Sequence, residues 1–160
     1  MEFLKPTLLS AYIGAFLFLA ALLVAIFPPS TSRVFLNQRR AVESTRELNL
    51  AEHSYAAQHP DAGFACELSE LGEQGVGPPV GLIDRVLASG TKSWYHFEIR
   101  CSQSGSEKAT VYTITAVPTL PGTTGVYAFC ADQKGEIWYS ENGSISDCLA
   151  MHKPIEQKYR

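Results

Sequence analysis

The stretch Ser93-Trp94-Tyr95-His96-Phe97-Glu98-Ile99-Arg100-Cys101 decides the fold class, because its residues alternate in chemical character. One set comprises Tyr95, Phe97, Ile99 and Cys101, and the other comprises Trp94, His96, Glu98 and Arg100. A period of two places one set on each face of a β-strand. We therefore predict a half-buried strand over Ser93–Cys101 and a sheet with one face against a core.

Three segments after this strand also have the composition of β-strands. Ala109–Val117 is rich in Val, Thr, Tyr and Ile. Val126–Ala131 and Glu136–Ser140 flank Asp132-Gln133-Lys134-Gly135, which is typical of a hairpin turn. The sequence thus predicts a four-stranded antiparallel sheet, followed by a polar tail over residues 151–160.

The segment before the sheet has helical periodicity. Between Arg33 and Ala57, apolar residues recur at threes and fours, and most charged residues, Glu52 among them, are assigned to the other side of the helix. The predicted packing face consists of Val42, Leu48, Ala51 and Tyr55. A second, short helix is predicted over Val80–Ala88. Helices before a run of antiparallel strands indicate an α+β domain, here over residues 33–150.

The chain also contains an uncharged apolar run, TLLSAYIGAFLFLAALLVAIF, from Thr7 to Phe27. Its 21 residues match a hydrocarbon layer of about 30 Å as a helix. A buried core helix and a cleaved signal peptide are the alternatives. However, a helix that is apolar on all sides is hard to bury in so small a domain, and the run is long for a signal peptide. We interpret it as a retained single-pass membrane anchor. Residues 1–6 flank it, and Pro28-Pro29 opens a break over residues 28–32.

The orientation of this anchor stays open on the residues alone. Arg33, Arg39, Arg40 and Arg46 follow the run, which favours a cytoplasmic C-terminal domain under the positive-inside rule. Four widely spaced cysteines oppose this, because an even number in a small domain is typical of disulfides in an oxidising compartment. These are Cys66, Cys101, Cys130 and Cys148. They allow three connectivities, and four buried thiols are the alternative.

Neither motifs nor composition indicate catalysis. The chain has a net charge of −3 and contains no basic patch that could bind nucleic acid. No nucleophile elbow, phosphate loop or zinc spacing occurs, and we expect no metal or cofactor. The histidines (His53, His59, His96 and His152) and the carboxylates of Glu67 and Glu70 are interpreted as surface groups. Trp94 and Trp138 are candidates for a partner-binding surface on the outer face of the sheet.

Four stretches together resemble type IV pilin-like and pseudopilin-like proteins, in particular a bacterial group of acidobacterial type. They are Ala41–Tyr55, Gly81–Lys92, Pro121–Val126 and Phe129–Ile137. The resemblance covers roughly Ala41 to Cys148. It implies a helix across a small antiparallel sheet and a periplasmic domain at the inner membrane. It also implies a Cys130–Cys148 disulfide that closes a C-terminal loop, which leaves Cys66–Cys101 as the second pair.

The function that this resemblance implies is structural, as an accessory component of a type IV pilus or type II secretion system. Its partners would be membrane lipid through residues 7–27 and other pilin-like or secretion subunits. The alternative is a membrane-tethered periplasmic binding module that is unrelated to pili and uses the exposed sheet or the Pro118–Gly125 loop.

One departure from the family pattern concerns the N-terminal segment. Prepilins have a glycine cleavage site and a glutamate within the apolar helix, but no glycine precedes Phe3 and the apolar run contains no glutamate. A charge in the membrane needs a partner, so the missing glutamate removes one reason to polymerise. We therefore expect a tethered protein and not a major fibre subunit.

Overall fold

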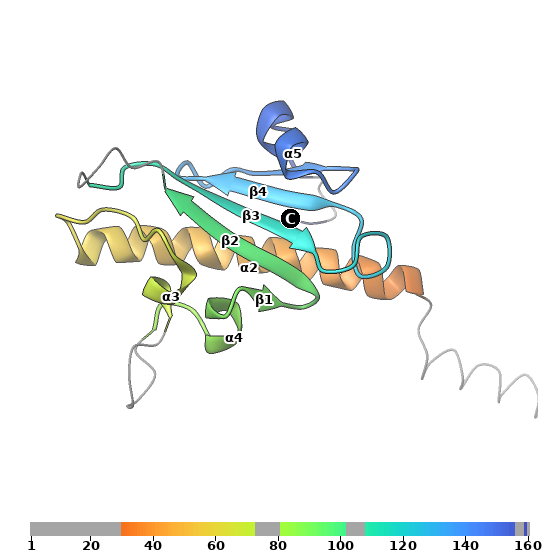
Figure 1. Cartoon of the computed structure of the whole chain (residues 1–160), viewed down its shortest axis with the longest axis horizontal. Coiled ribbons are helices and arrows are strands. Elements are labelled where there is room, and N and C mark those ends of the chain that lie inside the picture. The colour runs from red at the N-terminus through yellow and green to blue at the C-terminus, as the bar shows by residue number, and fades with distance from the viewer. Residues whose placement is uncertain (1–29, 73–80, 102–107, 156–158, 160) are drawn as a thin grey trace, which may run out of the picture. The chain divides into compact units, whose positions relative to one another are not determined.

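The computed structural model describes residues 30–72, 81–101, 108–155 and 159. The chain divides into two compact units, Met1–Arg33 and Val34–Arg160. The second unit is an α+β domain in which one long helix lies along an antiparallel sheet (Figure 1). The predicted membrane span, Thr7–Phe27, and the flank before it lie outside the described residues. Within the part that is described, no helix has the length and apolar character needed to cross a bilayer.

Helix α2, Ser30–Gln58, is the longest element of the domain. It begins directly after Pro29 and ends before His59-Pro60, so prolines stand just outside both ends. The predicted packing face lies against the core: Val42, Leu48 and Ala51 are buried, and Tyr55 is partly buried against the same cluster. A 29-residue helix in this chain is thus held by tertiary packing along much of one side.

The sheet has the strand order β1-β2-β3-β4-β5, and all neighbours are antiparallel. The strands are β1 Thr91–Lys92, β2 Tyr95–Cys101, β3 Tyr112–Pro118, β4 Ala128–Asp132 and β5 Ile137–Ser140. The four predicted strands are present, but the predicted four-stranded sheet has a fifth strand, β1. Two residues are too few to show an alternating pattern, and β1 pairs with β2 because the chain reverses tightly at Ser93 and Trp94.

The alternation in β2 and β3 delivers large side chains to one side of the sheet. Tyr95, Phe97 and Ile99 of β2 are buried, and so are Tyr112 and Ile114 of β3. These side chains form a single core with the α2 stripe. We call this side of the sheet the inner face, and the opposite side the outer face.

Two short helices, α3 Leu68–Leu71 and α4 Arg85–Ala88, cover the β1–β2 edge. The predicted helix Val80–Ala88 is therefore too long, because Asp84 is the N-cap and its carboxylate accepts from the Leu87 amide. The Lys92 ammonium lies 2.6 Å from Asp84 Oδ2 and 3.1 Å from Glu47 Oε2. This one cation therefore links α4, β1 and α2.

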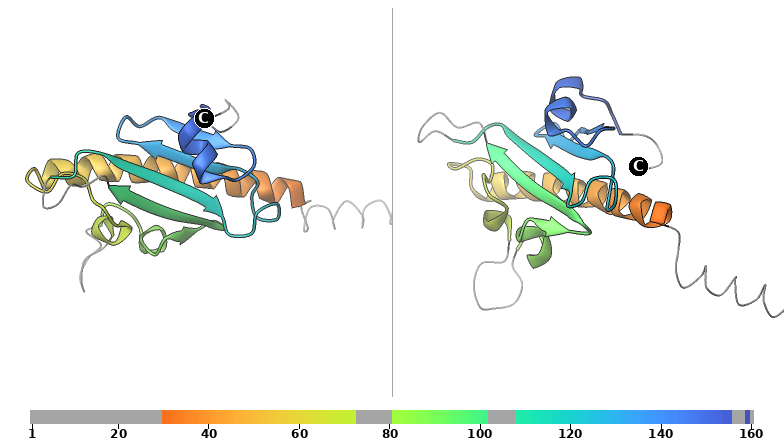
Figure 2. Two further views of the ribbon diagram at one scale, coloured as in Figure 1. Left: turned by 45° about the horizontal axis from the view of Figure 1, so that its top comes forward. Right: turned by 45° about the vertical axis from the view of Figure 1, so that its right-hand side comes forward.

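Within the predicted polar tail, the described residues 152–155 and Tyr159 pack on the domain. Helix α5, Ile145–Met151, was not predicted, and it lies across the outer face, opposite α2 (Figure 2). Beyond it, Tyr139 N donates to Lys153 O (2.9 Å) and Ile155 N donates to Ile137 O (3.2 Å). The residues after α5 thus extend the sheet at β5, since backbone pairing requires no apolar sequence pattern. Tyr159 is buried in the core.

We expect Leu48→Ala to lower the free energy of unfolding by roughly 3 kcal/mol, because the Leu48 side chain is fully buried between α2 and the sheet. Leu50→Ala is the matched control, since Leu50 lies on the same helix and is 71% exposed. It should change stability by less than about 0.5 kcal/mol. Denaturant unfolding of the full chain in detergent, followed by tryptophan fluorescence, measures both. Equal losses would contradict the assigned packing face.

Candidate functional site

The outer face of the sheet carries an open groove beside α5. Side chains of β2 and β3 that point away from the core form its floor and its rim, and α5 forms one wall. The lining residues are His96, Glu98 and Arg100 from β2, Thr113, Thr115 and Val117 from β3, and Ile145 and Leu149 from α5. The groove has a volume of about 310 Å³. It exists because α5 covers only the β4–β5 half of the outer face.

The groove combines an apolar wall with a polar, charged rim. Glu98 Oε1 lies 2.8 Å from Arg100 Nε in an exposed ion pair, and His96 Nδ1 lies 3.5 Å from Thr91 Oγ1. Leu149 is exposed on the wall. Such a surface suits a segment that offers apolar side chains to α5 and hydrogen-bonding groups to β2. In the described ranges, no three His, Cys, Asp or Glu residues are placed to hold a metal ion.

A disulfide attaches α5 to the sheet. Cys130 of β4 is bonded to Cys148 of α5, with 6.2 Å between their Cα atoms. Both half-cystines are completely buried and cluster with Trp138 of β5. His152, the C-cap residue of α5, packs edge-on against Trp138, with 4.3 Å between the two ring centroids. The wall of the groove is therefore positioned by a covalent bond and by a small apolar cluster that is separate from the main core.

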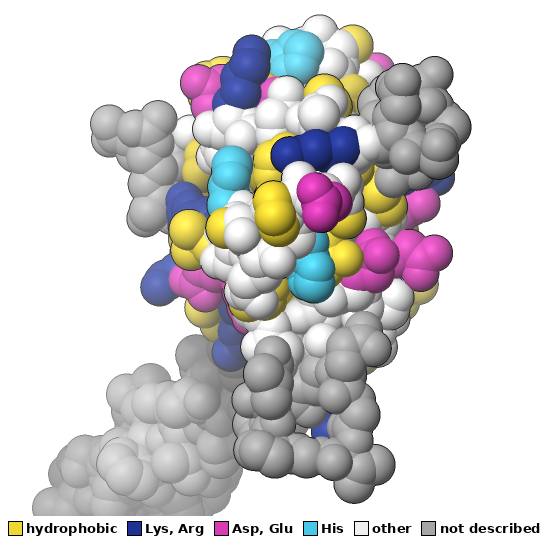
Figure 3. Space-filling model, turned by 90° about the vertical axis from the view of Figure 1, so that its left-hand side faces the viewer, with side chains coloured by type: hydrophobic (Ala, Val, Ile, Leu, Met, Phe, Trp, Pro, Cys, Tyr) yellow, Lys and Arg dark blue, Asp and Glu magenta, His cyan; other side chains and the backbone are white. Residues whose placement is uncertain are grey.

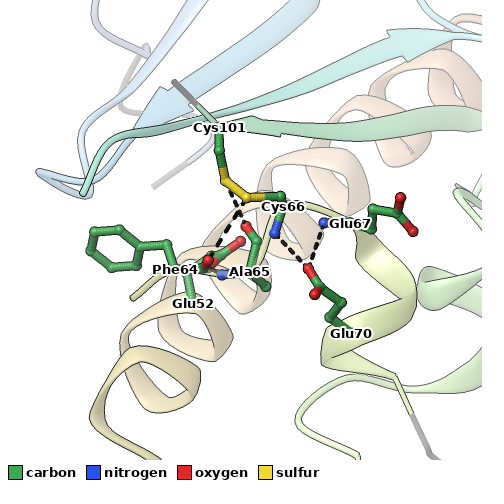
Figure 4. Close-up of a disulfide and its surroundings, with 7 residues drawn as sticks. All are labelled: Glu52, Phe64, Ala65, Cys66, Glu67, Glu70 and Cys101. Carbon is green, nitrogen blue, oxygen red and sulfur yellow. Dashed lines mark hydrogen bonds between the residues drawn. A yellow bond between two sulfur atoms is a disulfide. The ribbon is translucent and has the colours of Figure 1, made fainter. Parts of the chain in front are cut away.

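The second disulfide, Cys66–Cys101, joins the loop after α2 to the end of β2, with 5.2 Å between Cα atoms (Figure 4). Glu52 of α2 points into this region, and its Oε2 accepts from Ala65 N at 2.9 Å. Glu70 Oε2 accepts from the amides of Cys66 and Glu67, which holds the loop in place. The loop is thus fastened by one covalent bond and by carboxylates from two helices.

Glu52 is fully buried, which corrects the prediction that it lies on the solvent side of α2. It follows Leu48 by one helical turn and so shares its face. Burial raises the pKa of Glu52 to about 7; the Ala65 amide opposes this, and the nearby Glu70 carboxylate reinforces it. Its Oε1 atom and Asn49 Nδ2 are buried without a hydrogen-bond partner in the described structure. Asn49 Oδ1 accepts from the Tyr112 hydroxyl at 2.8 Å.

The two predicted surface tryptophans are not brought together. Trp94 lies in the β1–β2 turn and is 61% exposed, whereas Trp138 lies on β5, at the other side of the sheet, and is 8% exposed. The prediction of a shared partner surface is therefore wrong for Trp138. It points to the outer face as expected, but α5 and the residues after it cover it.

Apart from His96, the remaining predicted residues make contacts within the fold. All four cysteines are in disulfides. Glu70 completes a capping box with Glu67 at the start of α3. The histidines lie apart: His53 contacts Phe64, His59 contacts Tyr55, His96 lines the groove and His152 contacts Trp138.

Sequence reasoning missed the groove, because its wall is the unpredicted helix α5. A usable signal was present: Ser144 caps α5 by accepting from Asp147 N at 3.2 Å, and a Ser followed three residues later by an acid is a helix-start pattern. Comparison of the chain with protein-family models, curated proteins and solved structures finds no match.

We expect the double variant Cys130→Ser/Cys148→Ser to lose about 3 kcal/mol of stability, since the disulfide closes a loop with a sequence separation of 18. Because the bond holds α5 to the sheet, amide hydrogen exchange should accelerate most in Ile145–Met151. The Ala41–Ala51 segment of α2 serves as the internal reference and should change only with global stability. Unchanged exchange in α5 would show that the apolar cluster alone positions the helix.

The raised pKa of Glu52 predicts that stability falls as pH rises from about 4.5 to about 7. In this window the unfolded chain releases the Glu52 proton while the folded chain keeps it. Below the window both states are protonated, and above it the loss levels off at roughly 3 kcal/mol. Glu52→Gln should remove this slope in denaturant titrations across pH. The exposed Glu43→Gln variant is the control and should retain the slope; a slope that persists in Glu52→Gln would contradict the assignment.

Proposed function

We propose that the chain is a membrane-anchored, non-catalytic interaction protein with a pilin-like domain, which serves as an accessory component of a type IV pilus or type II secretion system. The observation that carries this proposal is the course of α2. The helix begins three residues after the end of the apolar run at Phe27, and its later turns pack against a small antiparallel sheet. One element thus leads from the proposed anchor into the core of the domain.

The two disulfides support a periplasmic location for the domain at the inner membrane of a bacterium. Both link segments that are distant in sequence, and such bonds persist in oxidising compartments. The exposed arginines Arg39 and Arg40 favour the opposite orientation under the positive-inside rule. We give the disulfides more weight, because the rule concerns the bias of charge around a span whereas the bonds require an oxidant.

The groove on the outer face supports the assignment of an interaction role. Its wall, α5, belongs to a C-terminal region closed by the Cys130–Cys148 bond, which is the loop that pilin-like proteins commonly close in this way. Because α2 occupies the inner face, the groove is a part of the described sheet that is open to another subunit. We therefore place the partner contact at the α5 wall and the β2–β3 floor.

A binding module unrelated to pili is the second candidate function. The charged rim around Glu98 and Arg100 favours it, because such a rim also suits a small polar ligand. The two candidates differ in what occupies the groove: a protein subunit in the first, and a soluble molecule in the second.

A photo-crosslinking amino acid at Leu149 tests the proposal in cells. Leu149 is exposed on the groove wall, so the substituted chain should form adducts with pilus or secretion subunits. The same substitution at Leu50, which is exposed on α2, is the matched control and should form few adducts. Mass spectrometry of the adducts identifies the partners.

An alkaline phosphatase fusion after Arg160 checks the orientation in the same strain, and the proposal requires an active fusion. An inactive fusion with free thiols would place the domain in the cytoplasm and contradict the proposed periplasmic location. Two results together would overturn the pilus or secretion role and favour the binding module. The crosslinker at Leu149 would form no adducts, and a deletion strain would show normal piliation and secretion.

A further inference from the structure

Exposed apolar side chains gather at the end of the domain where α2 begins. We call this group the proximal pole; its members are Phe35, Leu36, Trp94, Leu120 and Val126, all of them exposed. They come from the first turns of α2, the β1–β2 turn and the loop between β3 and β4. In Figures 1 and 2 that loop lies beside the start of α2.

Hydrogen bonds hold the three segments of the proximal pole together. Asn37 Nδ2 of α2 donates to Thr124 O at 2.9 Å, and Gln38 Oε1 accepts from Val126 N at 2.9 Å. The loop is joined to the β1–β2 turn in turn, because Thr119 N donates to Trp94 O at 3.0 Å. The three segments that carry the apolar side chains are therefore fixed to one another by hydrogen bonds.

The backbone at Trp94 is strained. The two turn residues, Ser93 and Trp94, have φ of 53° and 66°, in the left-handed region. Two-residue hairpin turns of this kind favour Asn and Gly, and a bulky residue there is unfavourable. The indole is 61% exposed, so core packing does not compensate for the strain. Strain of this kind concentrates at functional positions, which points to a use for the indole outside the fold.

The opposite end of the domain has a different surface. Figure 3 views the end where α2 finishes, and there basic, acidic and histidine side chains are interspersed among apolar groups. The proximal pole instead combines an indole, a phenyl ring and aliphatic side chains, with the exposed Arg39 and Arg40 on the next turn of α2. Tryptophan with flanking arginines is the composition of a membrane–water interface.

The length of the connecting chain limits how far this surface can lie from the proposed anchor. Phe35 follows Phe27, the last residue of the predicted span, by eight residues. Even fully extended, such a link reaches only about 28 Å, which is less than the thickness of a hydrocarbon core. With the proposed anchor in the bilayer, so short a tether keeps the proximal pole within that distance of the bilayer surface.

We propose that the proximal pole is a lipid-binding surface that seats the domain on the bilayer interface, with the Trp94 indole inserted at headgroup level. This inference rests on the proposed anchor. It extends that proposal, because it assigns the proximal pole as the side of the domain that faces the bilayer. The outer-face groove then faces sideways along the membrane, toward neighbouring proteins.

The two tryptophans of the chain provide a matched test. Trp138→Phe leaves Trp94 as the only indole, and Trp94→Phe leaves the buried Trp138 on β5. The full chain of each variant is placed in phosphatidylcholine–phosphatidylglycerol vesicles with brominated or ordinary acyl chains. We expect brominated lipid to reduce Trp94 emission by about half, as for an interfacial tryptophan, and to leave Trp138 emission nearly unchanged.

Flotation of the same vesicles separates the two proposals. Chains that float with the vesicles but show no bromine quenching of Trp94 would overturn the docking surface and leave the anchor intact. Chains that do not float would overturn both. Trp94→Asn provides a further check: relief of the turn strain should keep or raise the denaturant midpoint, whereas a lower midpoint would assign the indole to packing and overturn the proposal.

Discussion

The packing of α2 on the inner face of the sheet is the interaction on which the rest of this domain depends. The α2 stripe meets strands whose alternation places Tyr95, Phe97 and Tyr112 on the same side, and together they form one core. A small sheet with an uncovered apolar face is marginal in water, and a lone helix likewise gains most of its stability from packing. Each of the two elements therefore provides the surface that the other needs.

This packing also explains the polar groups in the core. A helix that crosses a sheet closely brings every residue of one face inside, and Asn49 and Glu52 lie on that face with Leu48. Their partners come from elsewhere in the chain: the Tyr112 hydroxyl from β3 and the Ala65 amide from the loop held by Cys66–Cys101. The disulfide therefore supports a buried carboxylate as well as a loop, and the charge state of that carboxylate depends on its burial.

With the inner face closed, the outer face and the proximal pole remain for interactions. The Cys130–Cys148 bond holds α5 over one half of the outer face, and the groove lies over β2 and β3. The proximal pole is joined to α2 through Asn37 and Gln38. The two surfaces differ in chemistry: one has a charged rim and a short apolar wall, and the other has aromatic and aliphatic groups that suit lipid.

The sequence by itself determined the α+β class and the four main strands, because their signals are local. These signals are the alternation of β2, the composition of β3 and the hairpin turn between β4 and β5. It also determined α2 to within three residues, since prolines stand outside both of its ends. Only the tertiary structure decided the burial of Glu52, the covering of Trp138, the extension of β5 and the short strand β1. For Glu52, Trp138 and β5 the deciding partner is distant in sequence, as Ala65 is for Glu52 and Pro154 is for Trp138. Strand β1 pairs with the next strand along the chain, but it is too short to show a pattern. Local pattern records which face a residue occupies on its own element, but only the folded chain decides what that face meets.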